Sequence, residues 1–286
     1  MLKYRLIFGT LMTIFFTAVA IFGGWVDGSL TVSPADDKHV QGTVLCILIT
    51  ILVIPAQLEF SKLAAARDLR VFPALTIPAS ILLATTWYWP RVLCFEPHLY
   101  VSVVCASSML ACLLFHNVCY GTSSVIANCG ANLFSIVYLG LLSAFVLGVR
   151  IDFGLWPLLM FVFVVKSSDV GAYAFGRLFG RHKFSARISP GKTWEGMAGA
   201  VIVAVIVAVA FALGRGIMVW WLAMIFGFCF AFIGQLGDLA ESMIKRDAEK
   251  KDSAHNVPGF GGVLDIIDSP LVAGLFAYVF FMCSSR

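Results

Sequence analysis

The sequence predicts an all-α fold, a polytopic bundle of membrane-spanning helices. Of its 286 residues, 60% are hydrophobic and only 13% are charged, whereas an ordinary soluble domain has about a quarter of its residues charged. The mean hydropathy is +0.93, and the charge-poor runs reach the length of about 20 apolar residues that a membrane helix needs. The net charge of +4 is modest, and without a basic patch or stripe nucleic acid is set aside as a partner.

Nine apolar stretches follow one another along the chain. The first begins after Lys3 and Arg5 and is too long for the hydrophobic region of a signal peptide. No small-residue cleavage site follows it, so we expect it to be retained as a span. The nine expected spans lie near residues 6–25, 42–58, 71–89, 99–115, 132–149, 153–172, 197–213, 217–236 and 268–283.

The basic residues predict the orientation of these spans, because cytoplasmic loops carry an excess of Lys and Arg. With a cytoplasmic N-terminus, 14 of the 20 basic residues fall in cytoplasmic segments, five fall outside, and Lys166 lies within a span. We therefore expect nine spans and a C-terminus outside. Residues 1–150 are expected to form a membrane scaffold. Residues 151–286 are expected to form the catalytic region, with cytoplasmic loops at 173–196 and 237–267.

A polar segment continues directly from the eighth stretch. If the helix persists, Asp238, Glu241, Ser242 and Lys245 lie at i, i+3, i+4 and i+7, which is one helix face. Carboxylates beside Lys245 and Arg246, at the depth where a span meets the cytoplasm, suit a metal-bound phosphate. A solvated helix end with ion pairs four residues apart is the alternative.

A glycine-rich turn precedes the ninth stretch. Pro258, Gly259, Gly261 and Gly262 disfavour a helix and fit a backbone that bends tightly or approaches a ligand closely.

Two carboxylates follow this turn. Asp265 and Asp268 stand at i, i+3 at the start of the ninth span. Carboxylates from two helices meet the requirement of Mg²⁺, which takes oxygen ligands and is usually shared with substrate phosphates. We therefore expect Asp238 and Asp265 to hold the metal, with Glu241 and Asp268 as further candidates. Helix capping is the alternative for Asp265 and, at least equally favoured, for Asp268.

The loop before the seventh stretch contains Gly191-Lys192-Thr193. A phosphate-binding P-loop is rejected, because its first glycine is missing, no strand precedes it and Pro190 removes an amide donor. What remains is a basic loop able to hold polyphosphate through Lys192. Upstream, Asp169 and Tyr173 lie four residues apart on one helix face in an apolar neighbourhood.

Together these motifs resemble the phosphatidate cytidylyltransferases, also called CDP-diacylglycerol synthases. The resemblance rests on the run S-x-x-K-R-x(4)-K-D-x-A-x(3)-P-G-x-G-G-x-x-D-x-x-D from Ser242 to Asp268. It also rests on Asp169, Tyr173, Gly176-Arg177 and the segment 189–196. These motifs cover roughly the last 120 residues, and the first 160 residues match only as membrane spans.

Three positions depart from the family pattern. Phe260 stands where the family usually has His, Ile266 where it has Arg, and Gly191 where Lys is frequent. Because Phe260 and Ile266 replace the usual His and Arg, a direct role for those two side chains cannot be carried over. The carboxylates are retained, so the metal site can be carried over.

The resemblance implies that CTP and phosphatidic acid react to give CDP-diacylglycerol and pyrophosphate, with Mg²⁺ as cofactor. It further implies a multi-pass protein of a bacterial-type inner membrane, in contact with membrane lipid, with its active site on the cytoplasmic side. A homodimer and a monomer both stay open. The expected catalytic residues are Asp238, Asp265, Lys245 and Arg246, and the expected substrate-binding residues are Lys192, Ser242, Asp252, Asp169, Tyr173, Gly261 and Gly262.

Three alternatives stay open at this point. In a transporter, Lys166, Asp169 and Asp238 would line an ion path, but the first half of the chain has no counterpart to these charged segments. A CTP-using kinase of a polyprenyl alcohol would need a base for a hydroxyl, and none is obvious. A catalytically weakened relative would explain Phe260 and Ile266.

Overall fold

The structure is a computed structural model that describes residues 2–30, 38, 40–185, 187–254 and 261–284. The described part is an all-helical bundle, which confirms the expected fold class, and its only strand-like pairing is one antiparallel bridge between Lys183 and Thr193. The first half contains α1 (Leu2–Val26), α2 (Thr43–Ala65), α3 (Pro73–Ala84), α4 (Trp89–Leu93), α5 (Pro97–Tyr120), α6 (Val125–Ser135), the π-helix η2 (Ile136–Leu141) and α7 (Leu142–Phe153). The second half contains α8 (Leu155–Phe179), α9 (Trp194–Arg215), α10 (Trp220–Asp247) and α11 (Leu264–Ser284).

Eight helices in the described residues are long and apolar enough to cross a membrane, with α6, η2 and α7 forming one continuous span. The expected span at 71–89 differs from the other eight. It folds as α3, whose 12 residues rise only about 18 Å against a hydrocarbon layer of about 30 Å. Two prolines, Pro73 and Pro78, lie in this helix, and α3 packs against α2, α5 and η2.

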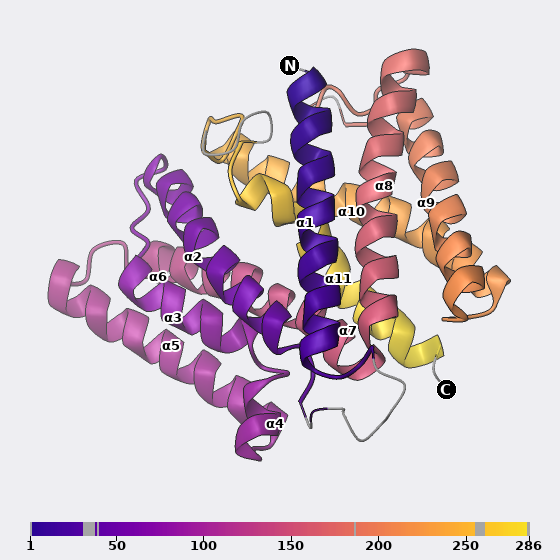
Figure 1. Ribbon diagram of the computed structural model, residues 1–286. Helices are drawn as coiled ribbons and strands as arrows, with labels where there is room; N and C mark the ends of the chain where they lie inside the picture. Colours follow the sequence, from indigo (N-terminus) through magenta and orange to yellow (C-terminus); the bar gives the residue numbers. More distant parts are fainter. Residues whose placement is uncertain (1, 31–37, 39, 186, 255–260, 285–286) are drawn as a thin grey trace.

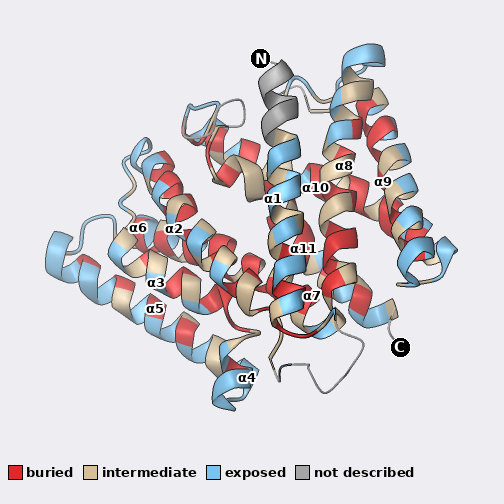
Figure 2. Ribbon diagram, in the orientation of Figure 1, coloured by how far each residue is buried: buried red, intermediate tan, exposed pale blue. Residues whose placement is uncertain are grey.

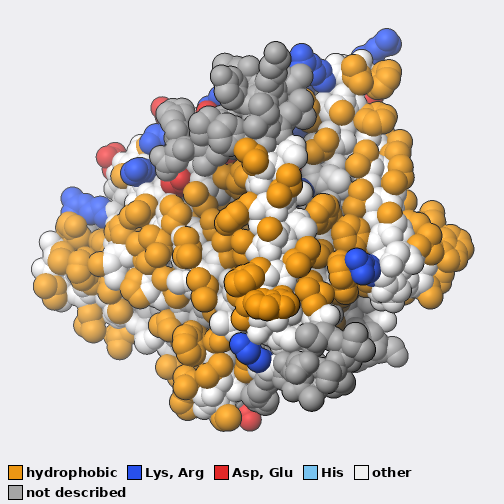
Figure 3. Space-filling model, viewed as in Figure 1, with side chains coloured by type: hydrophobic (Ala, Val, Ile, Leu, Met, Phe, Trp, Pro, Cys, Tyr) orange, Lys and Arg blue, Asp and Glu red, His pale blue; other side chains and the backbone are white. Residues whose placement is uncertain are grey.

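The surface agrees with a membrane setting. Figure 3 shows hydrophobic side chains across a broad middle band of the visible face, with most Lys and Arg side chains above it. The marked termini lie at opposite ends of the bundle (Figure 1). The two helix-connecting segments at 180–193 and 248–263 are shorter than the expected loops, because α8 continues to Phe179 and α10 to Asp247.

The core lies where the helices of the second half meet α7, and small residues allow the close approach. On α9, the buried alanines at every fourth position are Ala200, Ala204, Ala208 and Ala212. A Cβ built on Gly227 of α10 would lie 2.6 Å from the Cα of Val205. Figure 2 shows buried residues concentrated on α7, α8, α10 and α11, while α1 and α5 are mostly exposed or half-buried. The helices that carry the polar motifs therefore form the buried centre of the molecule.

At the opposite end from the polar segments, a buried ion pair fastens the first two helices. Arg150 of α7 and Asp27 are 2% and 1% exposed, and their Nη2 and Oδ2 atoms lie 2.7 Å apart. The same carboxylate oxygen accepts a hydrogen bond from the backbone N–H of Gly42 at 2.9 Å. The pair satisfies two buried charges and holds the connection between α1 and α2 against the end of α7.

A second hydrophobic cluster joins the two halves beside the polar segments. Phe60 and Leu63 of α2 pack in it with Tyr138 of η2 and with Leu264 and Leu271 of α11. The scaffold half of the chain thus contacts the helix that carries the last two candidate carboxylates, so its role extends beyond facing lipid.

Candidate functional site

The polar face predicted at the end of the eighth stretch is present. Helix α10 continues without interruption to Asp247, so Asp238, Glu241, Ser242 and Lys245 lie along one side of it. Glu241 is fully buried, and Ser242 and Lys245 are each 9% exposed. Lys245 and Arg246 lie in the last turn, where positive charge offsets the negative end of the helix dipole.

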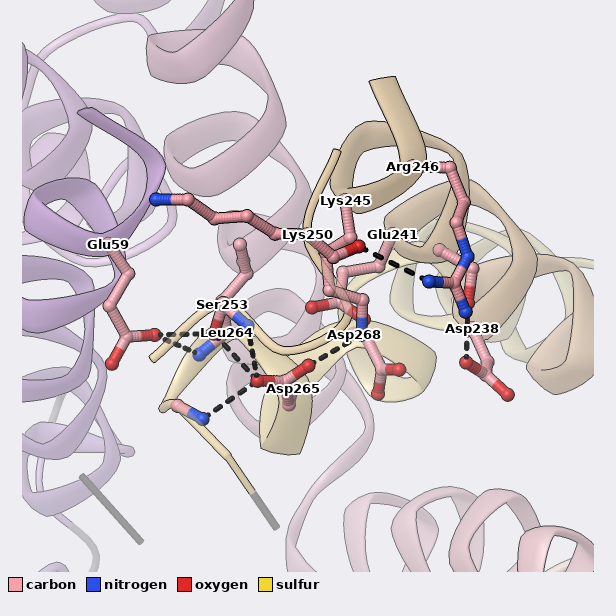
Figure 4. Close-up of polar contacts among 12 residues, drawn as sticks. Glu59, Asp238, Glu241, Lys245, Arg246, Lys250, Ser253, Leu264, Asp265 and Asp268 are labelled. Atoms are coloured by element: carbon pink, nitrogen blue, oxygen red, sulfur yellow. Dashed lines mark hydrogen bonds and ion pairs between the residues drawn. The ribbon is translucent and has the colours of Figure 1, made fainter. Parts of the chain in front are cut away.

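The start of α11 is fixed by two carboxylates. Asp265 accepts hydrogen bonds from Gly262 N–H at 2.7 Å, Ser253 N–H at 3.1 Å and Ser253 Oγ at 2.7 Å. Glu59 of α2 accepts from Val263 N–H at 3.0 Å, Leu264 N–H at 2.9 Å and Ser253 Oγ at 3.1 Å. Together they satisfy backbone donors that the first turn of a helix leaves without an internal partner. Figure 4 shows Glu59 and Asp265 converging on Ser253.

The glycines of the turn are explained by this arrangement. Gly261 has a φ of +98°, and a Cβ on it would lie 2.5 Å from Oδ2 of Asp265. A Cβ on Gly262 would lie 2.1 Å from Ser253 Oγ and 2.3 Å from Glu59 Oε2. The two glycines therefore let the turn approach the carboxylates that hold it.

Three carboxylates from two helices converge beside this turn. One oxygen each from Asp238, Glu241 and Asp268 can be chosen so that all lie within 4.8 Å of one another. Oε1 of Glu241 receives no hydrogen bond from the residues that the structure describes, and Oε2 lies 2.5 Å from Lys245 Nζ. Such a group is suited to a hard divalent cation, which takes carboxylate oxygens as ligands. We call Asp238, Glu241 and Asp268 the acidic triad (Figure 4).

Lysines approach the acidic triad from three helices or their ends. Lys192, just before α9, places Nζ 2.9 Å from Oδ2 of Asp238 and donates to the carbonyl of Gln235 at 3.0 Å. Lys245 lies between two carboxylates, at 2.5 Å from Glu241 and 2.5 Å from Asp265. Lys166 of α8 places Nζ 3.9 Å from Asp268. Cations therefore surround the site where a phosphate would approach.

The acids still outnumber the lysines. Lys166 also lies 3.8 Å from Asp169. The acidic triad joins three sets of ion pairs, which together contain three lysines and the five carboxylates Asp169, Asp238, Glu241, Asp265 and Asp268. The five carboxylates exceed the three lysines by two. Buried charge is costly without compensation, so the composition of the group fits a bound cation.

Asp265 has a different environment from the acidic triad. The sequence placed it with Asp238 as a metal ligand, whereas its carboxylate here is occupied by Lys245, Ser253 and Gly262. Asp268, which the sequence favoured at least equally as a helix cap, accepts a hydrogen bond from the N–H of its neighbour Ser269 at 2.6 Å and also joins the acidic triad.

The other expected residues lie around this centre. Arg246 donates from Nε to the carbonyl of Ile188 at 3.2 Å and from Nη1 to that of Lys250 at 3.3 Å, and so ties the two connecting segments together. Asp169 accepts a hydrogen bond from Gln235 Nε2 at 3.2 Å. Tyr173 is 45% exposed and accepts from Arg177 at 3.1 Å. Asp252 is half-buried in the 248–254 segment.

The structure describes two of the three positions that depart from the family pattern. Ile266 lies in the first turn of α11, and its backbone carbonyl accepts a hydrogen bond from Lys166 Nζ at 2.8 Å. Gly191 has open space where a Cβ would be, with nothing within 4 Å. Phe260 lies outside the described residues.

Several residues of the site were not identified from the sequence. Glu59, Gln235 and Ser253 were passed over, and Lys166 was considered only for an ion path. Glu59 and Lys166 carry the signal that an ionisable residue within an apolar run gives. Gln235 and Ser253 carry no such signal, because polar uncharged residues are common in both kinds of segment.

Comparison with known proteins adds an independent observation. A model of the cytidylyltransferase family matches residues 38–284. A Bacillus subtilis protein named phosphatidate cytidylyltransferase is 29% identical over 256 residues, which cover 84% of this chain and 95% of that protein. Proteins of the same name from Haemophilus influenzae and Mycobacterium bovis are 43% and 39% identical, over 43% of this chain in each case. These two matches cover only 46% and 40% of the relatives' own lengths.

Proposed function

Because the chain belongs to the cytidylyltransferase family, we propose that it is a phosphatidate cytidylyltransferase. It transfers CMP from CTP to phosphatidic acid and forms CDP-diacylglycerol and pyrophosphate. The observation that carries the proposal is the acidic triad with lysines from three sides, at the ends of helices long enough to span a membrane. A site of this kind can receive a lipid phosphate and a nucleotide triphosphate together.

The reaction needs little covalent help from the protein. An oxygen of the phosphatidic acid phosphate forms a bond to the α-phosphorus of CTP, and the bond from that phosphorus to the bridging oxygen of pyrophosphate breaks. Both reactants are anions, so the protein contributes mainly positioning and charge neutralisation. The ionised phosphate is itself the nucleophile, and no base is required. This agrees with a site built from carboxylates and lysines.

Lysines are the groups of this chain that would offset the phosphate charge. Lys192 follows a short connecting segment and places its ammonium group 2.9 Å from Asp238, so a triphosphate bound next to the acidic triad would lie within its reach. Lys245 is held on both sides by carboxylates and sets the position of Glu241. Arg246 keeps the two connecting segments together. In this scheme Lys192 contacts phosphate, while Lys245 and Arg246 shape the site.

Magnesium fits the residues present. The acidic triad would hold it, since its oxygens come within 4.8 Å of one another and the fully buried Glu241 has an oxygen that receives no hydrogen bond from the described residues. When bound, Mg²⁺ would neutralise phosphate charge and polarise the reacting phosphorus. The carboxylates of Asp169 and Asp265 would complete the surrounding charge without being ligands.

The acidic triad lies on the last turns of α10 and the first turns of α11, at the side of the bundle that the basic residues predict to be cytoplasmic. CTP would reach the site from the cytoplasm, and phosphatidic acid would reach it at the helix ends that lie at the membrane boundary. The bacterial relatives support an inner-membrane location. We infer that phosphatidic acid enters from the cytoplasmic leaflet.

The proposal predicts that pyrophosphate release requires CTP, phosphatidic acid and Mg²⁺ together. The measurement uses the purified full chain in detergent, with labelled CTP, and detects both pyrophosphate and the labelled lipid. Omitting any one of the three should reduce turnover to background, because the charge of two anionic reactants must be offset before they meet.

Two controls separate the parts of this claim. Diacylglycerol in place of phosphatidic acid tests whether a lipid phosphate is the acceptor, and no labelled lipid should form. Excess chelator tests the cation, and full turnover in its presence would remove the metal assignment. Transfer to diacylglycerol at the rate seen with phosphatidic acid would overturn the proposed acceptor.

A further inference from the structure

The hydroxyl of Tyr138 is buried and accepts or donates no hydrogen bond among the residues that the structure describes. The residue is 7% exposed. A buried hydroxyl without a partner is unfavourable, and nearly all such groups in proteins are hydrogen-bonded. A phenylalanine would fill the same hydrophobic space without this cost, so the hydroxyl itself calls for an explanation.

The ring of Tyr138 is held firmly. It stacks on Phe134 with ring centroids 5.6 Å apart and planes 8° from parallel, and it packs in the hydrophobic cluster with Leu264 and Leu271 of α11. The residue belongs to the π-helical turn η2. Single π-turns inside helices shift the side chains that follow and occur often at functional sites. The hydroxyl is therefore set in one place by its surroundings.

The surroundings of the hydroxyl point to a ligand. Leu264 and Leu271, which pack in the same cluster as Tyr138, stand four residues before and three residues after Asp268 on α11, so Asp268 shares their helix face. The hydroxyl is hydrogen-bonded to no residue that the structure describes, Asp268 and Glu241 included. Lysines of the second half of the chain approach the acidic triad, and the Ser242 hydroxyl and the Ser269 N–H, also from the second half, donate to Asp238 and Asp268. Tyr138 comes from the first half and offers a neutral donor from a different direction. A neutral donor suits an oxygen that the lysines do not reach.

We propose that Tyr138 is a ligand-binding residue of this site, whose hydroxyl donates a hydrogen bond to an oxygen held at the acidic triad. The oxygen belongs either to a substrate phosphate or to a water on the cation, which offer the same acceptor chemistry. The inference rests on the proposed function, because it takes the acidic triad as the place where cation and phosphate bind. It assigns a role in the site to the first half of the chain.

The test is Tyr138→Phe in the full chain, purified in detergent, with thermal unfolding followed without ligand, with Mg²⁺ alone and with Mg²⁺ plus CTP. Without ligand, the variant should unfold at the wild-type temperature or above, because it loses a hydroxyl that had no partner. With ligand, its apparent affinity should be weaker by roughly 10- to 100-fold, the loss expected for a hydrogen bond to a charged group. Weakening with Mg²⁺ alone assigns the oxygen to a bound water, and weakening only with CTP assigns it to a phosphate.

Tyr278→Phe is the matched control. Its hydroxyl donates to Asp152 at 2.7 Å, far along α11 from the acidic triad, so this change should lower stability without ligand and leave the ligand response intact. Tyr138→Phe with wild-type affinity in every arm would overturn the inference, as would a loss of stability in the ligand-free protein. A wild-type chain that responds to neither Mg²⁺ nor CTP would instead contradict the proposed function.

Discussion

Asp238→Asn is expected to lower kcat by a factor of about 100 to 1000 while leaving the folded protein intact. The change removes one negative charge from the acidic triad without altering the shape of the side chain. Asp238 is 36% exposed, so we expect the variant to fold as the wild type does. Lys192 keeps its hydrogen bond to the carbonyl of Gln235. The effect should therefore fall on cation and phosphate binding, measured as lipid product per unit time over a range of Mg²⁺ concentrations.

Asp247→Asn is the control for this change. Asp247 lies on the same helix, is 69% exposed and pairs only with Arg67 among the described residues, at 3.2 Å. Exposed ion pairs contribute little to stability, so this variant should keep wild-type turnover. Near-normal activity in Asp238→Asn would remove Asp238 from the site.

Lys245→Met is expected to have the largest effect on stability. Lys245 is 9% exposed and lies 2.5 Å from both Glu241 and Asp265. Its removal leaves two carboxylates without their shared counter-ion, which typically costs about 3–5 kcal/mol for a buried pair. The midpoint of thermal unfolding in detergent should fall markedly, and activity should be lost.

Two further variants show whether charge is the cause. Lys245→Met combined with Glu241→Gln removes one of the stranded charges and should recover part of the lost stability. Lys62→Met replaces an exposed lysine of α2 and should leave unfolding unchanged. A Lys245→Met protein as stable as the wild type would contradict the assigned ion pairs.

The sequence was sufficient to predict the fold class and the helix faces of the site. Periodicity placed Asp238, Glu241 and Lys245 on one face, and α10 carries them so. The same reasoning placed Asp265 and Asp268 at the start of the last span, where α11 begins. These predictions depend only on helix geometry and hydropathy, which are local properties.

What the sequence could not predict depends on contacts between distant segments. Glu59 meets the start of α11 across some 200 positions of chain, and no local pattern indicates that pairing. The 71–89 stretch is apolar enough for a span, but its prolines and its packing against α2, α5 and η2 leave a short helix. The π-turn at Tyr138 has no sequence signature of its own.

The division of roles between Asp265 and Asp268 is likewise a matter of tertiary contact. Both stand in the first turns of α11, three residues apart. Only the fold shows that Asp265 turns toward Ser253 and Lys245 while Asp268 joins Asp238 and Glu241.

Binding of Mn²⁺ as a substitute for Mg²⁺, followed by the electron paramagnetic resonance of the free ion in the presence of CTP, tests the central claim most directly. The wild type and Asp265→Asn should bind Mn²⁺ similarly, because Asp265 is occupied by protein donors. Asp268→Asn should bind Mn²⁺ at least about tenfold more weakly, because replacing even a residue that only orients a metal ligand typically lowers metal affinity about tenfold or more. Wild-type binding by Asp268→Asn, with loss of binding in Asp265→Asn, would contradict the assignment of the cation to the acidic triad.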